Sequence, residues 1–267
     1  MLLPNDYWLD KILTKSFLLS PRALRHMAID DEFPLTPTVM ALYDLRTRAQ
    51  CEWSTVIVDA KFGCLLTHRT TRQLINHFLH HNLVDLHLSR ILLLYHQRRR
   101  FLPLILGNAV YLPLHGAQQT TSDWIGLHWQ RYFFQNRAAQ WVQFQTLNHY
   151  HLQFAYSSQR SLLRAIHDAC YLAHYCYWLT VQLVQNLGYQ LQASTVRNLL
   201  WLFEQCSCTL HKNLPPTAAE SKRFLQTFQI WTLQQVVALP EFSWSAQMQQ
   251  QVVHEWSALL MGHRYLW

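Results

Sequence analysis

Short apolar runs rich in β-branched and aromatic side chains recur through residues 38–156 of the chain. Runs of this length, separated by turn residues such as Gly63, are typical of strands. They predict strands at residues 39–44, 52–59, 65–67, 109–112, 123–129, 141–144 and 151–156. The last two should pair as a hairpin that turns near Asn148.

Two segments between these strands have apolar residues at helical spacing instead. Residues 72–81 place their apolar side chains on one face, and Thr70 or Thr71 can cap the start of that helix. Asn82 marks its expected end. Residues 83–95 repeat the helical spacing and predict a second helix, with a strand as the alternative for the second half of the segment.

From Ser157 onward the spacing is helical throughout, with breaks at prolines and glycines. It predicts helices over residues 157–188, 194–211, 217–237 and 244–262. The chain is therefore expected to adopt an α+β fold. A mixed strand-and-helix core, mainly antiparallel β with one or two helices, would span residues 1–185, and an α-helical C-terminal extension would span 186–267.

The predicted helices of the extension carry apolar faces that need a partner surface. These faces contain Leu199, Leu200, Leu202, Phe203, Phe224, Phe228 and Trp231. They can cover the core of the same chain, or they can contact a second copy or another protein. A truncation near residue 188 would separate these two interpretations.

The amino-acid composition predicts a sizeable hydrophobic core and a surface with unusually few charged residues. Half of the 267 residues are apolar or aromatic, so the chain can bury a core, whereas only 14% are charged. The six cysteines form no regular framework, and the first residues lack the basic start of a signal peptide. The longest apolar runs are far too short for a bilayer span. We therefore expect reduced cysteines, a cytoplasmic location and no membrane partner.

The net charge of +7 is concentrated in one part of the sequence. Residues 61–165 carry 11 Lys and Arg against only Asp85 and Asp123, whereas the segments before and after are close to neutral. A stretch so poor in acidic residues attracts polyanions, and double-stranded DNA is the commonest such partner. The alternative is a solvated basic face without a partner, but such surfaces normally mix both signs.

Arginines in this basic stretch are the candidate DNA-binding residues. The run Arg98–Arg100 (three arginines in succession) can hold phosphates or enter a narrow A/T-rich minor groove, although charge runs also occur at sheet edges that resist aggregation. Arg69 and Arg72 flank a predicted helix start, where the helix dipole also favours phosphate. The full candidate set is Arg69, Arg72, Arg90, Arg98, Arg99, Arg100, Arg131 and Arg137, the last two in an expected loop.

The spacing of histidines, cysteines and other potentially catalytic residues gives little support for a metal site or for an enzyme. Three sets of histidines and cysteines stand close together in the sequence: His77 with His81, Cys170 with His174 and Cys176, and Cys206 with Cys208. None has a paired CxxC or an HExxH arrangement, so no metal is expected. The six glycines of the chain form no phosphate-binding loop, and the sequence contains no GxSxG elbow. The basic stretch holds only two carboxylates, which do not support acid–base catalysis. The chain is expected to be neither an enzyme nor a cofactor-binding protein.

The order of several features resembles the ComK family of competence transcription factors over about residues 38–165. A cysteine-and-strand region, Cys51 to Leu66, precedes a helix and a basic stretch. A basic run then enters a proline-containing apolar strand at residues 98–106. A strand ending in Pro113 is followed by a Ser/Thr-rich loop and by Trp124-Ile125. The match ends with an aromatic–Asn turn and a Ser that opens a helix: Phe144, Asn148, Ser157 and Arg164-Ala165.

The resemblance implies a transcriptional activator of DNA-uptake genes that binds A/T-rich promoter boxes, largely through the minor groove, as a homo-oligomer. It also implies RNA polymerase and an adaptor–Clp protease system as partners. The extension beyond about residue 185 is longer than the family normally has. Two other classes compete: a helical interaction or adaptor protein without nucleic-acid binding, and a metal- or haem-dependent enzyme built from the His- and Cys-rich helices.

Overall fold

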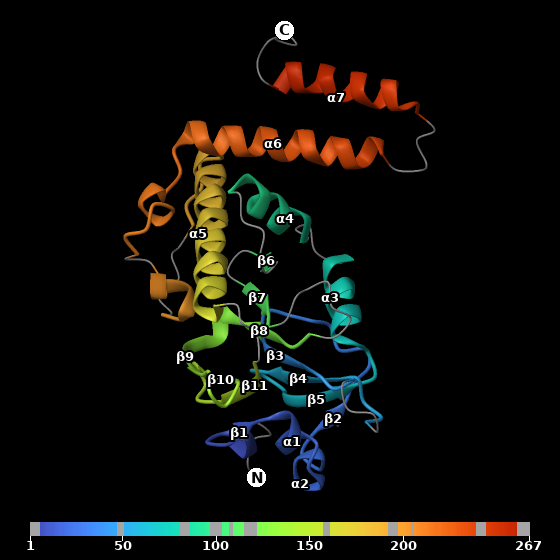
Figure 1. Cartoon of the computed structure of the whole chain (residues 1–267), viewed down its shortest axis with the longest axis vertical. Helices are drawn as coiled ribbons and strands as arrows, with labels where there is room; N and C mark the ends of the chain where they lie inside the picture. Colours follow the sequence, from blue (N-terminus) through green and yellow to red (C-terminus); the bar gives the residue numbers. More distant parts are fainter. Residues whose placement is uncertain are drawn as a thin grey trace.

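The fold of the chain was determined as a computed structural model. It describes residues 6–46, 51–80, 86–96, 103–106, 109–114, 122–156, 161–191, 197–203, 206–238 and 244–260. Within these residues, two sheets and seven α-helices build an α+β fold in which the C-terminal helices lie at one end and the N-terminal elements at the other (Figure 1). No helix in the described part of the chain is long and apolar enough to cross a membrane.

The larger sheet has seven strands and is mostly antiparallel. Its spatial order is β2 (Ala28–Ile29), β5 (Gly63–Thr67), β4 (Thr55–Asp59), β3 (Val39–Asp44), β8 (Trp124–Gly126), β7 (Ala109–Pro113) and β6 (Leu104–Leu106). Every residue of β3, β4, β5, β7 and β8 is buried, as expected for a sheet covered on both faces. Gly126 allows a close approach here, since a Cβ atom would lie 2.9 Å from the Val39 carbonyl oxygen.

The smaller sheet has four strands in the order β1 (Ile12–Leu13), β11 (His151–Ala155), β10 (Trp141–Thr146) and β9 (Gln130–Asn136). Strands β10 and β11 form the predicted hairpin, with Val142 opposite Phe154 and Phe144 opposite Leu152. Alternate residues of both strands are buried, so only one face of this sheet meets the core. The stacked rings of Tyr43 and Phe154 join the two sheets, with their centroids 4.4 Å apart.

The core lies in two layers, one on each face of the seven-stranded sheet. On one face, helix α3 (Thr71–His80) packs Leu74, Ile75 and Phe78 against the sheet. On the other face, the four-stranded sheet and the long helix α5 (Leu162–Asn186) enclose the larger cluster. Alternation along β4 divides its side chains between the layers, since Ile57 joins the first cluster whereas Val56 and Val58 join the second.

Local sequence explains where the main helices begin and end. The Thr70 hydroxyl accepts a hydrogen bond from the Gln73 backbone at the start of α3, and the Gln73 side chain accepts one from the Thr70 backbone. Helix α5 begins after Ser161, whose hydroxyl accepts a hydrogen bond from the Arg164 backbone. It ends before Gly188, whose φ of 82° suits the left-handed position after a helix.

The C-terminal extension packs against the core. After α5 come two 3-10 turns, η3 (Leu199–Phe203) and η4 (His211–Asn213), and then α6 (Ala218–Val237) and α7 (Ala246–Leu260). Helix α6 lies across the end of α5 and contacts α4 (Leu86–Tyr95), as Figure 1 shows. Leu199, Leu200 and Phe224 are buried in the larger core cluster, although Leu202 is 55% exposed. This part of the apolar face therefore covers the core of its own chain.

Several expected elements differ from the structure. The predicted helix over 194–211 is wrong, because the described part of that segment forms only η3 and the start of η4. The strand predicted over 123–129 ends at Gly126 and continues as the 3-10 turn η2 (Leu127–Trp129). The following elements were not predicted from the sequence: η1 (Asp6–Trp8), β1, α1 (Lys15–Leu18), α2 (Pro21–Leu24), β2 and β9.

Candidate nucleic-acid interface and a histidine–cysteine cluster

The arginines predicted at the start of α3 differ in their surroundings. The Arg69 guanidinium lies 2.8 Å from the Glu32 carboxylate, and the Arg69 side chain is only 24% exposed. Arg72 is exposed on the first turn of α3 and makes no ion pair with any carboxylate of the described residues. A buried contact holds this end of the helix, where the Thr71 hydroxyl donates to the Asp44 carboxylate. Arg72 is thus the more accessible of the two cations.

Two further candidates lie on the smaller sheet and its turn. Arg131 is an exposed residue of β9, so its expected place in a loop is wrong, whereas Arg137 is exposed in the turn that follows that strand. Arg90 is exposed on α4 and lies over the Trp231 ring of α6, 6.0 Å from the ring centroid. Residues 98, 99 and 100 lie outside the described residues.

The described arginines do not form one patch. Figure 1 shows α3 and β9 on opposite sides of the molecule, with the larger sheet between them. The helix that carries Arg72 and the strand that carries Arg131 therefore lie on different sides of the larger sheet.

The described acidic residue of the basic stretch, Asp123, does not offset these cations at the surface. Asp123 is buried, and its carboxylate lies 2.8 Å from the Lys15 ammonium and accepts a hydrogen bond from the Asp44 backbone. Asp85 lies outside the described residues. Two carboxylates from the first third of the chain pair with basic side chains of this stretch: Asp31 with His68, and Glu32 with Arg69. These two pairs therefore place acidic side chains beside the cations at the start of α3.

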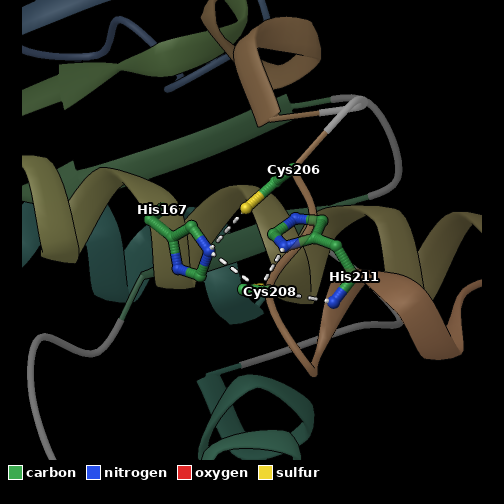
Figure 2. Close-up of side chains that lie close together, drawn as sticks. All are labelled: His167, Cys206, Cys208 and His211. Carbon is green, nitrogen blue, oxygen red and sulfur yellow. Dashed lines mark hydrogen bonds between the residues drawn. The ribbon is translucent and has the colours of Figure 1, made fainter.

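A second group of side chains, which we call the His–Cys cluster, comprises His167, Cys206, Cys208 and His211. Their potential ligand atoms all lie within 4.8 Å of one another. The Nε2 atom of His167 lies 3.7 Å from the Cys206 sulfur and 3.4 Å from the Cys208 sulfur. The Cys208 sulfur lies 3.2 Å from Nδ1 of His211. Figure 2 shows His167 projecting from α5 towards three residues of the loop that faces it.

Burial and hydrogen bonds shape the electrostatics of this cluster. Burial and the nearby His167 and His174 rings lower the pKa of His211 to about 4, so its imidazole is neutral at pH 7. Burial acts to raise the pKa of Cys208, but hydrogen bonds from the His211 backbone and the His167 ring outweigh it and lower that pKa to about 7. On the other side of the His167 ring, Nδ1 lies 3.2 Å from the Asp168 carboxylate.

This cluster was missed because His167 is distant in the chain from the other three members. Cys206 and Cys208 were noted as a pair, but residues two positions apart do not share a face in the helix predicted over 194–211. The spacing Cys206-x-Cys208-x-x-His211 was the available signal. Of the other sets considered, Cys170 and Cys176 are buried, and the Cys170 thiol donates to the Leu199 carbonyl oxygen. His81 lies outside the described residues.

The comparisons with known proteins identify no relative: the chain matches no protein-family model, no curated protein and no solved structure. The likeness to the ComK family therefore stays an interpretation of the sequence. Function has to be argued from the residues and their arrangement.

Proposed function

We propose that the chain is a non-catalytic, cytoplasmic DNA-binding protein that activates transcription of DNA-uptake genes. It binds double-stranded DNA at A/T-rich sites, mainly through phosphates and the minor groove, and works as a homo-oligomer with RNA polymerase. An adaptor–Clp protease system would limit its abundance. Polyanion binding is supported by the charge distribution, whereas the target genes and these partners rest on the resemblance to the ComK family.

The observation that carries the proposal is the one-sided charge of residues 61–165. Their one described acidic side chain, Asp123, is buried against Lys15 and contributes nothing to the surface. Arg72, Arg131 and Arg137 are exposed and make no ion pair with a described carboxylate. Exposed guanidinium groups without protein partners suit phosphate oxygens, and binding of this kind releases counterions.

The arginines have different roles in this proposal. Arg98, Arg99 and Arg100 enter the minor groove, where narrow A/T tracts concentrate negative potential. Arg72 binds a phosphate near the helix start, and Arg69 joins it only when Glu32 releases its guanidinium. Because α3 and β9 face opposite sides, a single duplex cannot lie flat on both faces. Arg131 and Arg137 therefore serve a second segment of DNA, as in pairs of boxes bound by an oligomer.

A three-residue variant tests the groove assignment. Arg98→Ala, Arg99→Ala and Arg100→Ala in one chain should weaken binding to a labelled A/T-rich duplex at least about tenfold. The slope of log K against log salt should fall by about 2.7 if each arginine neutralises one phosphate. Fluorescence anisotropy between about 50 and 200 mM salt measures both quantities.

A matched variant controls for net charge in this test. Arg197→Ala, Lys222→Ala and Arg223→Ala remove the same charge from exposed positions outside the basic stretch. This control should bind DNA nearly as tightly as the native chain. Equal losses in the two triple variants would show that bulk charge, not the run at 98–100, governs the affinity.

A helical interaction protein is the second candidate function, favoured by exposed apolar side chains at the C-terminal end. They are Leu183, Leu187, Tyr189, Leu191, Leu225, Val236, Trp244, Met248 and Trp256. Such side chains suit a protein partner or a second copy of the chain. This candidate takes first place if the folded chain binds neither A/T-rich nor G·C-rich DNA.

A further inference from the structure

We propose that His167, Cys206, Cys208 and His211 bind one Zn²⁺ ion in a closed, structural Cys2His2 site. None of the four residues is among the candidate DNA-binding arginines, so the proposal is independent of the proposed DNA binding. The site would clip the loop between η3 and η4 to helix α5.

The distances fit a tetrahedral zinc site. With Zn–S bonds of about 2.3 Å and Zn–N bonds of about 2.0–2.1 Å, neighbouring ligand atoms stand about 3.4–3.8 Å apart. The His167 nitrogen lies 3.7 Å and 3.4 Å from the two sulfurs, and the His211 nitrogen lies 3.2 Å from Cys208. All four donor atoms lie within 4.8 Å of one another, so small adjustments bring them around one ion.

The donor set selects zinc and a structural role. Two sulfurs and two imidazole nitrogens match the ligands that tetrahedral zinc takes in structural sites. Four protein ligands leave no open position for water or substrate, which separates this site from catalytic zinc centres. The ligands are half-buried or buried, with His211 only 7% exposed, so the ion would be shielded from bulk water.

Groups around the cluster orient its ligands. The Asp168 carboxylate lies 3.2 Å from Nδ1 of His167, leaving Nε2 directed at the sulfurs. Metal-bound histidines commonly hold such a carboxylate on the far ring nitrogen. The His211 backbone N–H donates to the Cys208 sulfur at 3.5 Å, an arrangement that stabilises a thiolate.

The loop has little other regular structure to hold it. Between the end of α5 and the start of α6 the described residues form only the two 3-10 turns. The residues just before and at the start of η3 are fixed to the core. The Asn198 side chain donates a hydrogen bond to the His128 carbonyl oxygen, and Leu199 is buried. The His–Cys cluster would fix the second half of the loop to α5. A metal clip would therefore add to the contacts that Leu210 and Leu214 make with the core.

The metal content of the full-length chain tests the proposal first. The chain is produced without a histidine tag, purified under reducing conditions without chelators, and analysed for metals by mass spectrometry. The expected result is about one zinc per chain, as for a closed four-ligand site. Folded chain that holds no zinc and takes up none from added Zn²⁺ would overturn the proposal, as would stoichiometric iron or copper in its place.

Cobalt substitution and variants then identify the ligands. The Co²⁺-loaded chain should show the visible absorption of tetrahedral cobalt with two thiolate ligands, and Cys208→Ser and His211→Ala should each lose it. His211→Cys should keep one metal per chain with a shifted spectrum, because three cysteines and one histidine also hold zinc. That conservative variant separates loss of a ligand from a failure to fold.

The controls remove a cysteine and a histidine outside the cluster. Cys51→Ser changes a half-buried cysteine of the first third, and His254→Ala changes an exposed histidine of α7. Both should keep about one zinc per chain and the native cobalt spectrum. Metal loss from either control, or native binding by Cys208→Ser and His211→Ala, would contradict the ligand assignment.

Discussion

The carboxylate of Asp123 lies 2.8 Å from the ammonium of Lys15, and this pair fixes the N-terminal segment to the edge of strand β8. The Asp123 side chain is only 3% exposed, whereas that of Lys15 is 22% exposed. Asp123→Asn should lower the free energy of unfolding by about 3 kcal/mol, near the lower end for a broken buried pair, because Lys15 still meets water. Urea denaturation measures this, with Glu52→Gln at an exposed site as the control. Equal small losses in both variants would show that the pair is unimportant.

Asp31 should titrate at unusually low pH. The backbone N–H of His68, the His68 ring and the Thr67 hydroxyl lower the pKa of Asp31 to about 2. Because the folded pKa lies below the unfolded value, about 3.9, its contribution to stability is complete above about pH 4 and is lost as the pH falls towards 2. Carbon-13 NMR of the carboxyl group measures the midpoint. In His68→Ala the midpoint should rise, and a native midpoint of about 4 would contradict the hydrogen bonding.

The C-terminal extension should be needed for a soluble fold. Phe224 of α6 is fully buried in the main core, so Phe224→Ala should cost about 3–5 kcal/mol of stability. Leu225→Ala, at the next position and 46% exposed, should cost much less. Truncation after Gly188 should give an insoluble product. A soluble, monomeric truncated chain would instead favour dimerisation as the role of the extension.

Asp168 should act as a positioning residue for zinc. Removing its carboxylate with Asp168→Ala should weaken zinc affinity by about 10–100-fold, because His167 loses the group that orients its ring. Asp168→Asn, which keeps an acceptor but no charge, should fall between the native chain and the alanine variant. Competition with a chromophoric chelator measures the affinities. Unchanged affinity in both variants would mean that Asp168 does not orient His167 in the metal-bound protein.

The sequence predicted the central strands because their neighbours bury them on one or both faces. Strands β3, β4, β5 and β7 are apolar along their length, and hydrophobic patterning reports that burial directly. Strand β9 was missed because Gln130 is its only buried residue and its apolar side chains Tyr132 and Phe134 are exposed. β9 is a strand because its backbone is hydrogen-bonded to β10, and the pattern of apolar and polar side chains does not reveal such backbone pairing.

The His–Cys cluster could not be predicted for a different reason. His167 belongs to a long helix, and its partners lie in a loop whose apolar residues have helical spacing. Leu199 and Leu200 are buried because the loop packs on the core, not because a helix continues through Cys206. Only the fold shows that this loop faces α5 at His167. Tertiary packing overrides local propensity in such segments.

The most direct test of the central claim is a fluorescence-anisotropy titration of the native full-length chain against two duplexes of equal length. One duplex carries two spaced A/T tracts and the other is rich in G·C, and both are measured at about 50 and 200 mM salt. The account predicts tight binding that weakens steeply with salt and prefers the A/T duplex, because the basic stretch meets DNA through phosphates and a narrow minor groove. Absence of binding to either duplex by folded protein would contradict the account and favour a protein-interaction role.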